Sequence, residues 1–346
     1  MTMRHAIVFV GLLGFVPAAA AQDFHIEDAG AARLADVAQL KPGVIAFSDQ
    51  WSGDAVDAGG VLIRFEDWAN KRPVQKKFLA LFPTYVEPTI AKPANGGGPM
   101  VEKLYMYVAQ ARFVLNRAPA AIDLSRYVTL PVLERIDPAI KHKLITAADV
   151  VPFNDDPGAG NDNPDRKWCT GRAILICIQS SYKLEGKIPI GVLLVNKLRD
   201  SVKKVSDTLD FQSELSAQAS ADVDQAALQE LTALDTPVSG VLEQDIFYVN
   251  QIMKFGKLLA VFQNHPSDAN KTVVTAFMSL AIKARVLDEK RDYENVPVLR
   301  NLVPAQVLMG QSSFNSGTSI SAGLLKYARN EISMIAGILQ KDSAAK

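Results

Sequence analysis

Residue types that commonly perform catalysis are few in this sequence. The chain has four histidines and two cysteines, and no two histidines are four residues apart, as a metalloprotease helix requires. A Gly-x-Ser-x-Gly elbow, which presents a nucleophilic serine in many hydrolases, is also absent. We therefore assign no catalytic residue and no zinc site from the sequence.

A Ser-x-x-Lys pattern occurs twice, from Ser180 to Lys183 and from Ser201 to Lys204. In penicillin-recognising enzymes the lysine of this pattern activates a serine at the start of a helix. Ser180 instead ends a predicted strand, and neither Ser-Asp-Asn nor Lys-Thr-Gly accompanies it. A chance match explains the pattern better than a catalytic serine does.

The two cysteines, Cys169 and Cys177, suit a structural disulfide. In an oxidising compartment an even number of thiols usually pairs, and the short loop would be stabilised by roughly 2.5 kcal/mol. The spacing is not Cys-x-x-Cys, so a redox pair is the weaker alternative, and two buried free thiols are another. If the disulfide forms, neither sulfur can act as a nucleophile.

A polar loop is predicted over residues 151–168 because Asp, Asn, Gly and Pro dominate it. Its carboxylates offer the hard oxygen ligands that calcium prefers. The spacing does not match an EF-hand, and a solvated turn with local side-chain hydrogen bonds explains the composition equally simply. Calcium is the one metal that we consider, and no other cofactor is predicted. Its candidate ligands are Asp155, Asp156, Asp162 and Asp165.

Residues 1–21 have the pattern of a secretory signal peptide. Arg4 precedes a short apolar run, and the small residues Ala19 and Ala21 precede the expected cleavage point. The run is shorter than the roughly 20 residues that cross a bilayer, which argues against a membrane anchor. Cleavage after Ala21 would leave 346 − 21 = 325 residues beginning at Gln22. We therefore expect a periplasmic or secreted protein.

The overall charge of the chain limits the classes of molecule that we expect it to bind. The chain has 37 basic and 37 acidic residues, so its formal net charge is zero. Such a balance gives no general attraction to nucleic acid or to anionic lipid. No second apolar stretch suggests a transmembrane segment after signal removal. An apolar small molecule or another envelope protein remains as a candidate partner.

The periodicity of apolar residues predicts an α+β fold. Residues 22–150 are expected to be mostly helical, with an amphipathic helix over residues 101–115. Residues 169–346 are expected to form antiparallel β-hairpins packed against a long C-terminal helix that begins near Ser319. These two regions, separated by the polar loop, can also form one domain.

The apolar strands suggest a ligand cavity, although such residues more often form ordinary core. The residues expected to line it are Ile176, Ile190, Val192, Leu259 and Phe277. The favoured function is that of a non-catalytic, exported binding or envelope-associated protein. The alternative is an exported hydrolase with two buried carboxylates about 5–9 Å apart. A third interpretation is an assembly subunit, which a large exposed apolar patch would indicate.

Overall fold

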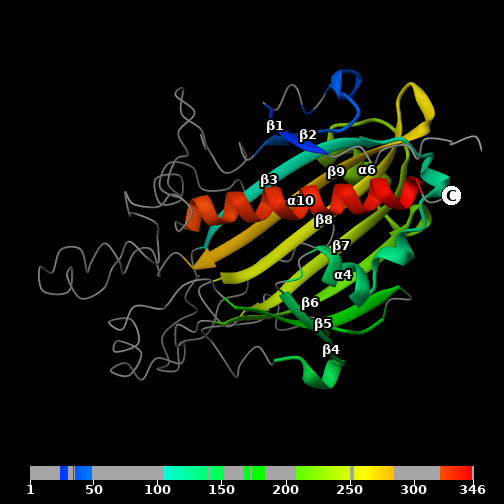
Figure 1. Ribbon diagram of the computed structural model, residues 1–346. Coiled ribbons are helices and arrows are strands. Elements are labelled where there is room, and N and C mark those ends of the chain that lie inside the picture. Colours follow the sequence, from blue (N-terminus) through cyan, green and yellow to red (C-terminus); the bar gives the residue numbers. More distant parts are fainter. Residues whose placement is uncertain are drawn as a thin grey trace, which may run out of the picture.

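A computed structural model of the chain shows one large β-sheet with a long helix lying across one face (Figure 1). Residues 1–23, and with them the predicted signal peptide, lie outside the described residues. The structure describes residues 24–29, 34, 36–48, 104–136, 138, 140–151, 167–171, 174–183, 208–249, 253–283 and 320–344.

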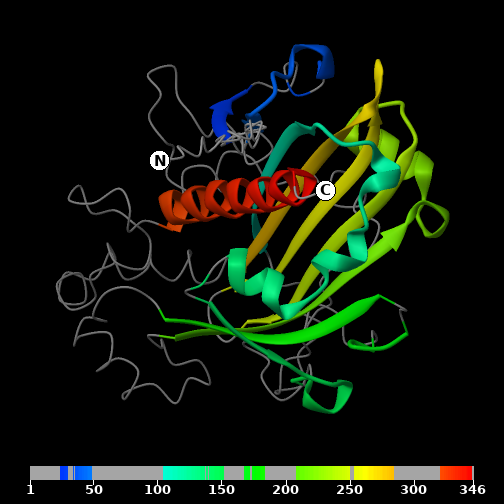
Figure 2. The same cartoon turned by 45° about the vertical axis from the view of Figure 1, so that its right-hand side comes forward.

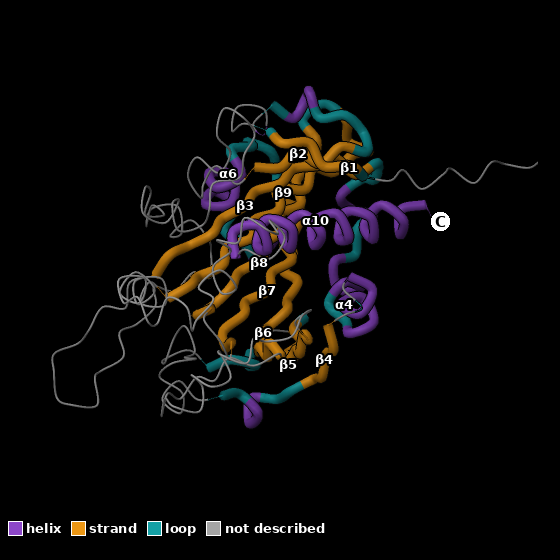
Figure 3. The backbone as a smooth tube through the Cα atoms, turned by 60° about the vertical axis from the view of Figure 1, so that its left-hand side comes forward, coloured by secondary structure: helices purple, strands orange, loops and turns teal. Residues whose placement is uncertain are grey.

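The sheet has nine strands in the order β1-β2-β3-β9-β8-β7-β6-β5-β4. Only the first pair, β1 with β2, is parallel, and every other neighbouring pair is antiparallel. Figure 3 follows this order from β1 and β2 at one edge to β4 at the other. The strands are β1 (His25–Asp28), β2 (Val44–Ser48), β3 (Leu104–Leu115), β4 (Ile140–Leu144), β5 (Leu175–Lys183), β6 (Thr208–Ala219), β7 (Val238–Val249), β8 (Met253–His265) and β9 (Asp268–Lys283).

The described residues contain three α-helices: α4 (Leu130–Ile136), α6 (Gln225–Thr232) and α10 (Ile320–Ala344). Helix α6 begins where the Asp224 side chain accepts a hydrogen bond from the Ala227 backbone N–H, a typical N-cap. It ends at Ala233, whose backbone is left-handed. The short 3-10 helices are η1 (Val37–Gln39), η3 (Pro119–Ala121), η4 (Leu124–Tyr127), η5 (Ala147–Asp149) and η6 (Ser220–Asp222).

The predicted α+β division into a mostly helical first half and hairpins against a C-terminal helix is wrong. Strands from both halves of the chain share one mixed sheet, and the expected helix over residues 101–115 is largely strand β3. The long C-terminal helix exists as α10, but it packs against β1 and β3 from the first half of the chain rather than over two hairpins in a separate half. Strand β3 is interior to the sheet and is buried on both faces, so it does not show the alternation of a half-exposed strand.

The two faces of the sheet differ in what covers them. The face that we call the α10 face carries Phe113, Ala276 and Leu258. Helices α4 and α10 pack on this face. Figure 2 shows the sheet curving around α10. The α6 face carries the alternate residues, among them Arg112 and Thr275, and α6 packs on it. Both faces are therefore buried along the central strands.

Helix α10 is fixed to the sheet by an apolar stripe and by one arginine. Ala328, Ile332 and Leu339 recur at helical spacing and are buried. The guanidinium of Arg329 lies 5.0 Å from the centre of the Phe47 ring and pairs with the carboxylate of Asp28. These contacts hold the helix against the edge formed by β1 and β2.

Candidate ligand-binding cavity

A cavity of about 110 Å³ lies between α10, α4 and the α10 face of the sheet. It is partly open, and most of its wall is aliphatic or aromatic. Its lining residues come from β3, β4, β6, β7, β8, β9, η4, α4 and α10, so segments far apart in the sequence meet there. The helical contribution from α10 is Glu331, Ile332, Ile335, Ile338 and Leu339.

The hollow exists because small side chains lie opposite the helix. Ala276 on β9 pairs with Ala111 on β3 and with Ala260 on β8, which places three alanines in one row across the sheet. Ala260 and Ala276 line the cavity and are only partly buried. A row of leucines at these positions would fill the space, so the alanine row is the local cause of the cavity.

Three polar side chains of the wall have their orientation fixed by hydrogen bonds within the protein. His142 Nδ1 lies 2.8 Å from Ser180 Oγ, across the pair β4–β5. Gln244 Nε2 donates to Ser213 Oγ at 3.0 Å, across the pair β6–β7. The third is Tyr127. Ser180 itself is fully buried and does not line the cavity, so it positions His142 and is not presented as a nucleophile.

Tyr127 connects the cavity wall to the end of α10. Its hydroxyl donates a hydrogen bond to the carboxylate of Asp342, and its side chain is buried. Burial raises the pKa of Tyr127 above the ordinary value of 10, and the negative charge of Asp342 raises it further. The positive charges of Arg117 and Arg126 lower the pKa of Tyr127, but by less than burial and Asp342 raise it. The phenol is therefore neutral and donating at physiological pH.

Glu331 is the acidic residue that α10 contributes to the wall. Only 8% of it is exposed, although it lies among Ile332, Ile335 and Ile338. Carboxylates are rarely buried to this extent unless they have partners. The sequence did not lead us to predict Glu331 as a wall residue. The signal that could have identified it is an acidic residue directly beside the apolar stripe of the last helix.

The predicted lining residues are distributed over both faces of the sheet. Leu259 and Phe277 border the cavity, but they are paired across β8 and β9 on the α6 face, where alternation directs their side chains. Ile176 packs in a neighbouring apolar cluster with Leu133 on the α10 face. Ile190 and Val192 lie outside the described residues. Residues missed from the sequence include Tyr127, His142, Gln244 and Glu331, because their proximity arises only from the strand order.

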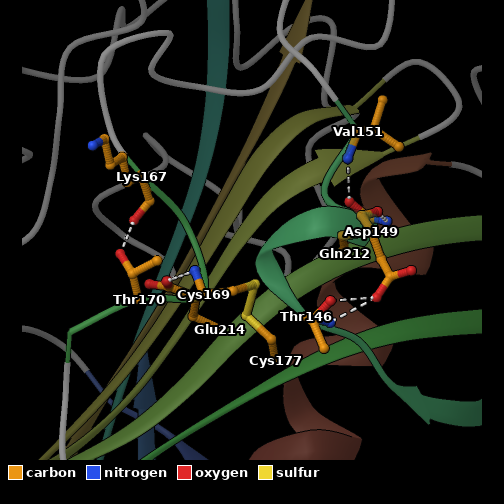
Figure 4. The surroundings of a disulfide bond; sticks show 9 residues. All are labelled: Thr146, Asp149, Val151, Lys167, Cys169, Thr170, Cys177, Gln212 and Glu214. Atoms are coloured by element: carbon orange, nitrogen blue, oxygen red, sulfur yellow. Dashed lines mark hydrogen bonds between the residues drawn. A yellow bond between two sulfur atoms is a disulfide. The ribbon is translucent and has the colours of Figure 1, made fainter.

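The cysteines form the predicted disulfide on the other face of the sheet (Figure 4). The Cα atoms of Cys169 and Cys177 are 5.6 Å apart, and no free cysteine occurs among the described residues. The backbone N–H of Cys169 donates to a carboxylate oxygen of Glu214 on β6. The disulfide and this hydrogen bond together attach the segment before β5 to the sheet.

Buried charges cross the α6 face in one row. Glu214 is the cross-strand partner of Asp245, which in turn faces Lys257 and forms an ion pair with its ammonium group. All three side chains are buried. Adjacent buried carboxylates are what the hydrolase alternative requires, but Glu214 and Asp245 do not line the cavity. Their described partners, Lys257 and the Cys169 N–H, give them a structural role.

The candidate calcium ligands Asp155, Asp156, Asp162 and Asp165 all lie outside the described residues. In the described part of the chain, the only group of three potential metal ligands is Cys169, Cys177 and Glu214. Both of its sulfurs are consumed by the disulfide, so this group does not form a metal site.

None of the helices in the described ranges is long and apolar enough to cross a membrane.

Comparisons with known proteins give distant structural likenesses. An aromatase/cyclase from Streptomyces sp. R1128 has a TM-score of 0.30 and 11% identity, with 68% of this chain and 93% of that chain covered. Norcoclaurine synthase from Thalictrum flavum has a TM-score of 0.28 and 9% identity, with 71% and 96% covered. Scores this low support no inference about function. No family model and no curated protein sequence matches the chain.

Proposed function

We propose that the protein is an exported, non-catalytic binding protein that takes up a small, mainly apolar molecule in the cavity under α10. The observation that carries this proposal is the partly open cavity with its aliphatic and aromatic wall. Ligand sites in proteins are typically concave and apolar, with a few polar groups that orient the ligand. Tyr127, His142, Gln244 and Glu331 are such groups here.

Export is supported by features of the sequence and is compatible with the described structure. The N-terminal pattern ending at Ala21 is typical of a cleaved signal peptide. The disulfide between Cys169 and Cys177 is the kind of cross-link that persists in oxidising compartments. The neutral net charge agrees with a small-molecule ligand rather than with a nucleic acid.

Binding of benzyl alcohol, a neutral single-ring probe, tests the proposal. A titration followed by ligand-observed NMR should show saturable binding to the wild-type protein, with a Kd of about 1 mM or tighter. Ala276→Leu adds side-chain volume directly into the cavity and should weaken binding about tenfold, a loss of about 1.4 kcal/mol.

Ala226→Leu is the matched control, because Ala226 is exposed on α6. It should leave the affinity for benzyl alcohol unchanged. Absence of saturable binding to the wild type, or equal affinity in the Ala276→Leu variant, would contradict ligand uptake at this cavity. Circular dichroism of each variant confirms that the comparison is made between folded proteins.

A further inference from the structure

We infer that the ligand of this cavity carries a neutral hydroxyl group, which the side-chain amide of Gln244 binds. This inference rests on the proposed function and specifies the chemical class of the ligand. It follows from the aliphatic surroundings of Gln244 on the sheet, from its hydrogen bond to Ser213, and from its distance to the alanines that leave space for a ligand.

Gln244 is a half-buried polar residue among aliphatic neighbours in the cavity wall. Its cross-strand partners are Leu215 on β6 and Leu258 on β8. Leu242 and Ile246, two residues before and after it on β7, project from the same α10 face. A polar group in such surroundings is costly unless it forms hydrogen bonds. Gln244 therefore gives this aliphatic part of the wall a defined polar position.

Ser213 fixes the orientation of this amide. Ser213 is fully buried on β6, and its hydroxyl oxygen accepts a hydrogen bond from Gln244 Nε2 at 3.0 Å. A glutamine amide has two N–H donors and a carbonyl oxygen with two lone pairs. Within the described part of the chain, Ser213 engages one N–H of Gln244. The carbonyl oxygen and the second N–H therefore have capacity for a ligand.

A neutral hydroxyl group matches the chemistry of this amide. A hydroxyl both donates and accepts hydrogen bonds, so it can bond to the oxygen or to the nitrogen of Gln244. An ionised group would lose its hydration beside Leu215 and Leu258, and a neutral amide does not compensate for that loss. A purely apolar group would displace water from the amide without replacing its hydrogen bonds. The ligand atom next to Gln244 is therefore a hydroxyl oxygen.

The position of Gln244 relates this hydroxyl to the apolar part of the ligand. Gln244 pairs with Leu258 on β8, and Ala260 lies two residues further along β8 on the same face. Diagonal neighbours of this kind are about 7–8 Å apart in an antiparallel pair. Ala260 and Ala276 are the small side chains that leave space opposite the helix. A single ring beside these alanines would reach Gln244 through a hydroxymethyl substituent.

Two probes of nearly equal shape test the hydroxyl group. Ethylbenzene carries a methyl group where benzyl alcohol carries its hydroxyl, and the two are otherwise identical. An apolar protein cavity of about 150 Å³ binds benzene. The present cavity, partly open and of about 110 Å³, is of similar magnitude. Ligand-observed NMR gives the affinity of each probe for the wild type, for Gln244→Met and for Gln179→Met. Gln179 is the matched control because it is exposed on β5 and does not line the cavity.

Gln244→Met removes the amide while keeping a side chain of similar length. The affinity for benzyl alcohol relative to that for ethylbenzene should fall roughly fivefold, because only benzyl alcohol loses a hydrogen bond. A change in cavity shape or in protein stability affects both probes and cancels in this ratio. Gln179→Met should keep the wild-type ratio.

A contact in the wild-type protein gives a second test that needs no variant. The side-chain amide protons of Gln244 should show nuclear Overhauser effects to the CH2 group of bound benzyl alcohol. Effects to the ring protons alone would contradict the inference, as would an unchanged affinity ratio in folded Gln244→Met. In either case, binding of ethylbenzene that Ala276→Leu weakens would still support the proposed function. If neither probe binds the wild type, the proposed function and this inference are both wrong.

Discussion

Arg112 shows how one residue can connect several elements of the fold. It is fully buried on the α6 face, where its Nε donates to Thr275 Oγ1 at 2.9 Å. Its two terminal nitrogens donate to the backbone carbonyls of Leu34 and Thr232. Burial lowers the pKa of Arg112 to about 10, because the charged guanidinium is removed from water. The hydrogen bonds offset that desolvation and attach α6 to the sheet.

Arg112→Met should destabilise the protein strongly. Methionine has a comparable length but no donors, so two buried carbonyls and a hydroxyl would lose their described partner. The expected loss is about 3 kcal/mol or more of unfolding free energy in urea denaturation. Arg135→Met, at an exposed position on α4, should change stability by no more than about 0.5 kcal/mol. Equal effects of the two substitutions would refute the role assigned to Arg112.

At the scale of single elements, strand β3 explains where sequence-based reasoning fails. Its apolar residues Val108, Ala111 and Val114 recur at a spacing that a helix would also show. In the sheet, Ala111 faces α10 while Val108 and Val114 lie on the opposite face, so apolar residues occupy both faces. Only the partner strands β2 and β9 settle the outcome. Helix α10, by contrast, has one apolar stripe and could be predicted from its own residues.

Tyr127 couples η4 to the last turn of α10, and its ionisation should report that contact. Because the folded pKa lies above the ordinary value, the unfolded chain releases the proton first as pH rises. The stabilisation is therefore complete below pH 10 and is lost above it. Tyr127→Phe should remove one step above pH 10 from an absorbance titration of tyrosinate and accelerate hydrogen exchange in residues 336–344. A wild-type titration identical to that of the variant would contradict this assignment.

The disulfide should stabilise the segment that precedes β5. Reduction frees Cys169, whose backbone has a positive φ of 64° and bonds Glu214. For so short a loop the expected loss is roughly 2.5 kcal/mol of unfolding free energy, measured with and without a thiol-free reductant. The double variant Cys169→Ser with Cys177→Ser is the control, since it should not respond to the reductant. A wild-type protein that also does not respond would show that the cross-link adds no stability.

At the scale of the whole molecule, the cavity depends on contacts that no local pattern encodes. The sequence alone identifies the cysteine pair and the last helix, because each depends on neighbouring residues. The cavity instead requires β4, β9 and α10 to meet, and they are separated by long stretches of chain. Glu331 becomes a candidate ligand-binding residue only after α10 is placed on the sheet. Fold and site could therefore be predicted only in part.

Export of the whole chain would account both for the signal-peptide pattern and for the disulfide. Expressed at full length in a bacterium with a periplasm, the protein should be recovered there with Gln22 as its first residue, since cleavage is expected after Ala21. Intact mass should be lower by two hydrogens than after reduction, because Cys169 and Cys177 are paired. Ala21→Glu, which removes the small residue before the cleavage point, should leave the precursor uncleaved. Recovery of the wild type in the cytosol with Met1 and free thiols would contradict export.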